Sequence, residues 1–300
     1  MFTERNPMDR NFPRVVVAIA KTLRWWMTKP FPLVGPHTIR SDEMNDSPPD
    51  TAEPGPTHRY DAAFYEHVKR TASHSAGSVL PCVKDAILLR PPESVLDVGC
   101  GPGSWVAVWL TLGVSDVLGL DRFDRGVPNA FAQHLASVDL TEPIHLGRRF
   151  DLAQCLEVAE HLHERHADTL VESICAHSDV VVFGAASPGQ GGDHHVNEQP
   201  ASYWREKFAD RGYDAYDALR PLLAPMKHVE PWYRYNTLVY ATPSGATRLS
   251  ANALSTKIGG QIPNNESLAW RMRRAAVQTM PKTMQQFGAW MLHRTSRRPS

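Results

Sequence analysis

Residues 95–103 join an apolar run to three glycines at alternate positions, and read Val95-Leu96-Asp97-Val98-Gly99-Cys100-Gly101-Pro102-Gly103. Such a turn needs glycines, because the sharp change of direction requires unusual backbone angles and a ligand must approach the backbone without meeting a Cβ atom. A helical pattern from Trp105 to Leu110 follows directly. A strand, a glycine turn and a helix in this order are typical of an α/β sheet that binds a nucleotide at the turn.

Short apolar runs alternate with helical patterns along the middle of the chain. The runs cover residues 94–98, 116–120, 150–156, 180–185 and 237–241. Alternation of this kind indicates parallel strands joined by helices. The runs at 150–156 and 180–185 are almost wholly apolar, as strands buried on both faces have to be. The sequence therefore predicts an α/β fold with a Rossmann-like, doubly wound and mostly parallel sheet and helices on both faces.

Three parts follow one another along the 300 residues. Residues 1–57 hold a basic, amphipathic segment and a polar linker, residues 58–243 hold the alternating pattern, and residues 244–300 form a basic extension. We expect the N-terminal segment to form a helix that packs on its own domain or on a dimer mate; contact with an anionic membrane surface is the alternative. We expect the C-terminal extension to be a loosely ordered, solvated tail, or to join the other basic terminus on a membrane or polyanion.

The composition argues against several classes of protein. The 32 basic and 32 acidic side chains give a formal net charge of zero, whereas proteins that grip long nucleic acids normally carry a basic surplus. The four cysteines form no CxxC pair, which predicts reduced core residues of a cytoplasmic protein. The apolar stretch at residues 15–20 is far shorter than the roughly 20 residues that span a bilayer.

Two acidic side chains accompany the glycine turn. Asp97 lies two residues before Gly99, and Asp121 ends the next apolar run. A carboxylate at the end of the second strand can accept hydrogen bonds from both hydroxyls of a ribose. With these features, residues 79–242 resemble the class I S-adenosylmethionine-dependent methyltransferases. A nicotinamide-dependent dehydrogenase would instead need Gly-x-Gly-x-x-Gly, which residues 99–103 do not supply.

The resemblance implies a binding site for S-adenosylmethionine. It assigns the three glycines of the turn to the methionine and ribose portion, Asp121 to the ribose, and Asp139, which follows the third strand, to the adenine amine. The cofactor-binding residues that it implies are Asp97, Gly99, Gly101, Gly103, Asp121, Asp139 and Leu156.

A Glu-x-x-Glu-His segment formed by Glu157, Glu160 and His161 follows the fourth strand. If the chain turns helical there, these side chains share one face and converge. Mixed oxygen and nitrogen ligands suit Mg²⁺ or Mn²⁺ better than zinc. The segment is similar to that of two metal-assisted branches, the small-RNA 2′-O-methyltransferases and the ubiquinone-pathway O-methyltransferases. In these the ion holds a vicinal diol or catechol and lowers the pKa of the attacking hydroxyl. The alternative is that the glutamates cap or form salt bridges and the histidine packs.

A polar, glycine-rich cluster at residues 187–199 follows the fifth strand. Its His194 or His195 completes the metal set, or serves as the general base, because neutral imidazole has a suitable proton affinity near pH 7. Solvation or helix capping is the alternative for either. The predicted metal ligands are Glu157, Glu160, His161 and His195, and the predicted catalytic residues are His161, His194 and His195.

These patterns predict an O-methyltransferase that uses S-adenosylmethionine and acts on a hydroxyl of a saccharide or saccharide-bearing small molecule, with help from Mg²⁺ or Mn²⁺. Vicinal hydroxyls match a divalent ion, and the loops offer many polar groups. One alternative is 2′-O-methylation of an RNA 3′-terminal ribose, which the zero net charge disfavours. The other is a non-catalytic scaffold that binds S-adenosylmethionine. A homodimer and peripheral membrane contact through the termini are further expectations.

Overall fold

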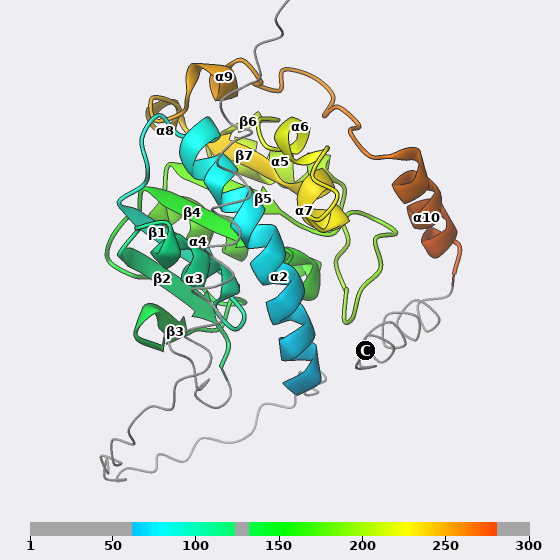
Figure 1. Ribbon diagram of the computed structural model, residues 1–300, viewed down its shortest axis with the longest axis horizontal. Coiled ribbons are helices and arrows are strands. Elements are labelled where there is room, and N and C mark those ends of the chain that lie inside the picture. The colour runs from blue at the N-terminus through cyan, green and yellow to red at the C-terminus, as the bar shows by residue number, and fades with distance from the viewer. Residues whose placement is uncertain (1–61, 124–131, 281–300) are drawn as a thin grey trace, which may run out of the picture. The chain divides into compact units, whose positions relative to one another are not determined.

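A single mixed sheet organises the chain in the computed structural model, which describes residues 62–123 and 132–280. The sheet has seven strands in the order β3-β2-β1-β4-β5-β7-β6 (Figure 1). The strands are β1 Ser94–Val98, β2 Asp116–Asp121, β3 Leu135–Ser137, β4 Leu152–Leu156, β5 Val180–Gly184, β6 Asp214–Tyr216 and β7 Leu238–Ala241. Only β7 runs antiparallel to its neighbours β5 and β6. The predicted Rossmann-like, mostly parallel sheet is confirmed.

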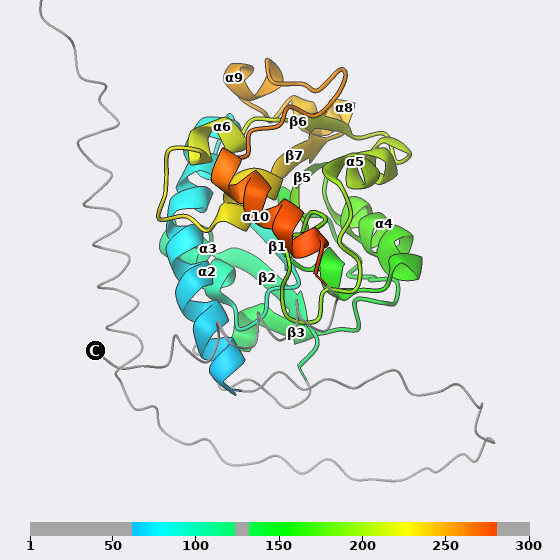
Figure 2. The same cartoon turned by 90° about the vertical axis from the view of Figure 1, so that its right-hand side faces the viewer.

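Helices cover both faces of this sheet, as predicted. The α-helices of the described residues are α2 Ala62–Cys82, α3 Ser104–Thr111, α4 Ala167–His177, α5 Ala201–Ala209, α6 Arg220–Leu223, α7 Pro231–Asn236, α8 Pro243–Ala246, α9 Ala251–Leu254 and α10 Leu268–Gln278. Figure 2 shows α2 and α3 on one side of the sheet and α4 and α5 on the other.

Two hydrophobic clusters form, one on each face of the sheet. Along β5, Val180 and Val182 belong to one cluster, and Val181 and Phe183 belong to the other. Successive side chains of a strand point to opposite faces, so a strand buried on both faces must be apolar at every position. Each such side chain contributes about 1.5–3 kcal/mol when fully buried.

The apolar runs did not mark the short strands β3 and β6. The resemblance did imply a third strand before Asp139, and β3 lies there. Leu135–Ser137 and Asp214–Tyr216 lie at the two edges of the sheet. Each strand has three residues, too few for an alternating pattern to stand out. Pairing with β2 and β7 holds them in the sheet.

The described part of the C-terminal extension differs from the solvated tail that we expected. Leu249 pairs with Leu88 in an isolated β-bridge, and the Ser250 hydroxyl donates a hydrogen bond to the Ala86 carbonyl at 2.7 Å. Trp270 on α10 is buried. The expected N-terminal amphipathic helix and residues 281–300 lie outside the described residues. Among the residues that the structure describes, no helix is long and apolar enough to cross a lipid bilayer.

Candidate active site

The glycine turn after β1 packs against the turn after β4. Gly99 has a φ of 80°, and a Cβ atom on it would lie 2.2 Å from the Val158 side chain. A larger residue at this position would therefore be strained and would push the two turns apart. A Cβ atom on Gly101 would meet no heavy atom within 4 Å, so open space adjoins the middle of the turn. Gly103 precedes α3 as its N-cap.

Asp121 holds the glycine turn from the end of β2. Its Oδ2 accepts a hydrogen bond from the Gly101 amide at 2.6 Å, and its Oδ1 accepts one from the Arg122 amide at 2.7 Å. Burial raises the pKa of Asp121, although these two hydrogen bonds oppose the rise. Each carboxylate oxygen has a second lone pair, so Asp121 can also accept both hydroxyls of a ribose.

Asp97 supplies a second acidic group below the turn. It is buried, and its Oδ2 has no hydrogen-bond partner among the described residues. Burial, with a smaller contribution from the charge of Asp121, raises the pKa of Asp97 to about 7. A buried polar atom of this kind calls for a partner. The open space at Gly101, the acceptor capacity of Asp121 and this oxygen together fit a bound S-adenosylmethionine.

The other two predicted cofactor residues lie at neighbouring strand ends. Asp139 follows β3, and its Oδ1 accepts hydrogen bonds from the Thr141 amide and hydroxyl at 2.9 and 2.6 Å. These bonds lower the pKa of Asp139. Leu156 is buried at the end of β4, beside Gly184 of β5. The predicted cofactor residues thus all lie along the carboxyl edge of the parallel strands.

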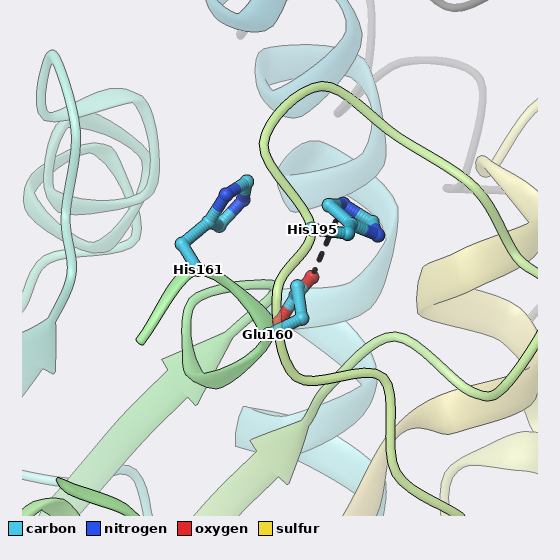
Figure 3. A group of neighbouring side chains, drawn as sticks. All are labelled: Glu160, His161 and His195. Atoms are coloured by element: carbon cyan, nitrogen blue, oxygen red, sulfur yellow. Dashed lines mark ion pairs between the residues drawn. The ribbon is translucent and has the colours of Figure 1, made fainter. Parts of the chain in front are cut away.

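A candidate metal group lies at the carboxyl ends of β4 and β5. Glu160 and His161 come from the 3₁₀ turn Ala159–His161, and His195 comes from the loop after β5 (Figure 3). One ligand atom from each residue lies within 4.8 Å of the others. The Val196 and Asn197 amides donate to the Glu160 carbonyl at 2.9 and 3.0 Å, and so hold the loop against the turn.

Glu160 carries the most unusual carboxylate of this group. It is fully buried, and neither carboxylate oxygen has a hydrogen-bond partner among the described residues. Burial, and next the charge of Glu157, raise the pKa of Glu160 well above its usual range. Burial also lowers the pKa of His161 to about 3, so this imidazole is held in the neutral form that binds metals. A divalent ion would satisfy the carboxylate of Glu160, and the neutral imidazole of His161 could serve as one of its ligands.

Glu198 orients His195 toward Glu160. Its Oε1 lies 2.9 Å from His195 Nδ1, and its two oxygens accept the amides of Gly189 and Gly191 at 2.8 and 2.7 Å. Burial opposes ionisation of Glu198, but these hydrogen bonds outweigh it and lower the pKa. An ionised carboxylate only accepts, so Nδ1 carries the proton and the lone pair of neutral His195 is on Nε2. A carboxylate behind a histidine in this way is typical of metal ligands.

The distance between His195 and Glu160 and the atom types of the group fit an ion. His195 Nε2 and Glu160 Oε1 are 4.0 Å apart, within the about 4.2 Å that two ligands of one ion can span when each bond is about 2.1 Å. One carboxylate and two imidazoles suit Mn²⁺ better than Mg²⁺, which prefers oxygen ligands.

Glu157 lies outside this three-residue group, in contrast to the predicted four-ligand set. Its Oε2 accepts from Gln190 Nε2 at 2.5 Å, and its Oε1 accepts from Asn236 Nδ2 at 3.1 Å. The predicted helical face does not form, because Glu157 has a φ of 57° and the 3₁₀ turn begins only at Ala159. Side chains three and four apart therefore do not line up as they would on an α-helix.

His194 lies next to Asp193, whereas His195 lies next to Glu160 and Glu198. His194 has a φ of 57°, and its Nε2 lies 3.2 Å from the Asp193 carboxylate. Its side chain is 35% exposed, whereas that of His195 is 11% exposed. The structure thus brings His195 to Glu160 and leaves His194 nearer the surface.

Three residues that hold the site were given no role from the sequence: Gln190, Glu198 and Asn236. Gln190 and Asn236 bond to Glu157 and to each other, at 2.8 Å from Asn236 Nδ2 to Gln190 Oε1. The unusual density of polar residues at 187–199 was the signal for two of them. Asn236 ends α7, far from that cluster in sequence, and carries no motif.

Aromatic side chains and a small pocket border the group. The rings of Trp105 and Tyr233 meet edge to face with centroids 5.0 Å apart. Burial, and next the charge of Glu157, raise the pKa of the Tyr233 hydroxyl, so this ring lies close to the site. A pocket of about 290 Å³ is lined by the loop around His195 together with Glu164 and Gln278.

Comparison with known proteins finds a match to one protein family and similarity to several solved structures. Residues 74–216 match a protein family described as a methyltransferase domain, a range that spans β1 to β6. No curated protein matches the chain.

Among solved structures, DesVI from Streptomyces venezuelae is 15% identical with a TM-score of 0.44, over 62% of this chain and 100% of that one. The sugar N-methyltransferase KedS8 from a Streptoalloteichus species is 15% identical with a TM-score of 0.43, over 66% and 99%. The small RNA methyltransferase HEN1 is 16% identical with a TM-score of 0.43, over 63% and 27%.

Proposed function

We propose that this chain is an S-adenosylmethionine-dependent methyltransferase, which the match of residues 74–216 to a methyltransferase domain supports. The acceptor is a hydroxyl of a saccharide or of a saccharide-bearing small molecule, and a divalent metal assists the transfer. We place the reaction in the cytoplasm, which the four free cysteines support.

The buried, unsatisfied carboxylate of Glu160 beside two imidazoles is the observation that carries this proposal. The packing of Val158 against Gly99 ties this group to the cofactor turn. A buried carboxylate without a hydrogen bond destabilises the fold unless a proton or a bound cation compensates its charge, and a divalent ion between Glu160 and the imidazoles would provide that compensation.

The reaction is an in-line displacement, in which the acceptor oxygen bonds to the methyl carbon as the carbon–sulfur bond breaks. The sulfonium becomes a thioether, and the hydroxyl proton is released. Asp121 would hold the ribose of the cofactor, and positioning of this kind supplies much of the rate. Trp105 and Tyr233 exclude water from one side.

Glu160, His161 and His195 would hold the metal. When bound, the ion supplies a Lewis acid that orients two neighbouring hydroxyls and lowers the pKa of the attacking one. In a metal-free reaction, His195 Nε2 would instead accept the hydroxyl proton, because Glu198 holds the proton on Nδ1.

The acceptor class is supported by the pocket beside His195. Amide side chains of Asn197, Gln199 and Gln278 line it, and amides both donate to and accept from hydroxyls. With a vicinal diol held at the metal group, the remaining hydroxyls of the saccharide would lie within reach of these amides.

A transfer assay tests the proposal. Labelled S-adenosylmethionine is incubated with glycosides that carry a vicinal diol, with their deoxy analogues, and with RNA oligonucleotides that carry a free 3′-terminal ribose. Each reaction is run with Mn²⁺ or with EDTA. Mn²⁺-dependent methylation of the diols and not of the deoxy analogues is expected. Methylation of RNA alone would move the acceptor to nucleic acid, and transfer unaffected by EDTA would remove the metal from the mechanism.

A further inference from the structure

The helix α10 lies beyond the residues of the methyltransferase family match, yet it borders the candidate active site. Figure 2 shows it crossing in front of the sheet, next to the loop that follows β5. The Ser267 hydroxyl caps its first turn and accepts the Trp270 amide at 3.2 Å. Nothing in the sequence of α10 had suggested a role in the reaction.

Side chains of α10 hold the backbone of the loop after β5. Arg274 Nε and Nη2 donate to the Pro188 carbonyl at 3.0 and 2.9 Å, and Gln278 Nε2 donates to the same oxygen at 2.8 Å. Arg273 Nη1 donates to the Gln190 carbonyl at 2.7 Å. Hydrogen bonds from a charged donor are stronger than those between neutral groups, so α10 holds this loop firmly.

The glycines of the loop allow α10 to approach its backbone. Gly189 has a φ of 81°, and a Cβ atom on it would lie 2.5 Å from the carbonyl oxygen of Arg274. A Cβ atom on Gly191 would lie 3.2 Å from a methyl group of Val277. The backbone of the glycine-rich loop is thus closely approached by a helix of the same chain.

The clamped backbone is the same backbone that orients His195. The amides of Gly189 and Gly191 bond to Glu198, and Glu198 bonds to His195 Nδ1. Burial lowers the pKa of Arg273 and the negative charge of Glu198 opposes this, so the two charged groups lie near each other. Contacts therefore run without a break from α10 through the loop and Glu198 to His195.

We infer that Arg273 and Arg274 of α10 are positioning residues, which fix the loop at 188–191 and thereby hold His195 Nε2 toward Glu160. The metal group then depends on a helix that lies outside the residues matched by the methyltransferase domain. Where it concerns metal affinity, this inference rests on the proposed function. The order of the loop does not depend on a metal and provides a separate test.

Three full-length variants test the inference. Arg274→Ala removes two donors to Pro188, and Arg274→Lys keeps the charge with a single donor group. Arg271→Ala is the matched control, because Arg271 lies on the same helix, is exposed, and makes no side-chain hydrogen bond or ion pair with any described residue. Each variant is titrated with Mn²⁺ by calorimetry, and amide hydrogen exchange is followed at residues 189–197.

We expect Arg274→Ala to weaken Mn²⁺ binding about tenfold or more, as loss of outer-shell partners does, and to speed exchange in the loop. Arg274→Lys should restore part of both, and Arg271→Ala should match the wild type. Equal Mn²⁺ affinity in the two alanine variants would overturn the inference. If the wild type itself binds no Mn²⁺, the proposed metal fails, and the exchange data decide: faster loop exchange only in Arg274→Ala supports the positioning role, and equal exchange refutes it.

Discussion

The substitution Gly192→Ala should displace His195 while leaving the backbone undisturbed. The φ of Gly192 lies outside the left-handed region, so alanine can adopt the same conformation. The added methyl group, however, would lie 2.2 Å from Nε2 and 2.4 Å from Cε1 of His195. The imidazole must therefore retreat by about 1 Å to reach an ordinary van der Waals contact.

A shift of this size is large compared with the tolerance of a metal site. Ligand distances are held within about 0.2 Å, and the displaced ring also loses its bond from Nδ1 to Glu198. A hydrogen bond to a charged group contributes about 1.5–3 kcal/mol, which corresponds to roughly a 10- to 100-fold change in an equilibrium constant. We expect Mn²⁺ affinity to fall by that factor.

Calorimetric titration of Mn²⁺ into the wild type and the variant measures the change. Gly259→Ala is the control, because a Cβ atom there meets nothing within 4 Å and its φ is also outside the left-handed region. That variant should keep wild-type affinity and be about 0.4–1 kcal/mol more stable. Equal Mn²⁺ affinity in Gly192→Ala and the wild type would refute the assignment of His195 as a ligand.

Three further predictions concern the acidic residues. Asp121→Asn should weaken binding of S-adenosylmethionine by roughly 10- to 100-fold in calorimetry, because charge-assisted bonds to the ribose are lost; unchanged affinity would remove Asp121 from the cofactor site. Glu160→Gln should abolish Mn²⁺ binding yet unfold at higher urea concentration than the wild type in EDTA at pH 8, because a buried carboxylate is replaced by a neutral group; lower stability would show that Glu160 is satisfied without a metal. Burial raises the pKa of Asp97 from its ordinary 3.8 to about 7. As the pH rises between these two values, the unfolded chain has already released the carboxyl proton of Asp97 and the folded chain still holds it, so the free energy of unfolding falls. In urea unfolding, the stability of Asp97→Asn should fall less from pH 5 to pH 8 than that of the wild type. An equal fall in both proteins would contradict the raised pKa of a buried Asp97.

The strands and cofactor turn could be predicted because local sequence determines them. A strand such as Val180–Gly184, buried on both faces, leaves a continuous apolar run, and the turn at Gly99 demands residues without a Cβ atom. These features rest on backbone geometry and burial that act over a few neighbouring residues. The short edge strands leave no such run, so the apolar pattern did not show them; only the resemblance implied a strand before Asp139.

The candidate metal group was predicted only in part, because its geometry depends on contacts between distant segments. Glu160, His161 and His195 do come together, but Glu157 is held by Gln190 and Asn236 instead. Asn236 is 79 residues from Glu157 along the chain. No pattern within one segment shows that its amide reaches this carboxylate.

The same limit applies to α10. Arginines at 273 and 274 in a basic C-terminal segment favour a solvated surface, and only the fold brings them to the carbonyls of Pro188 and Gln190. The approach of Arg274 also explains why Gly189 cannot carry a side chain. The glycines of the loop stood out in the sequence, and the structure shows that α10 packs against them.

Anomalous diffraction from crystals soaked with Mn²⁺ and S-adenosylhomocysteine tests the metal-assisted mechanism most directly. We predict one strong manganese peak within about 2.0–2.3 Å of a Glu160 oxygen and of nitrogens of His161 and His195, with the nucleoside over Gly101 and its ribose on Asp121. A crystal in which the nucleoside occupies that place but no manganese lies between Glu160 and His195 would contradict the mechanism.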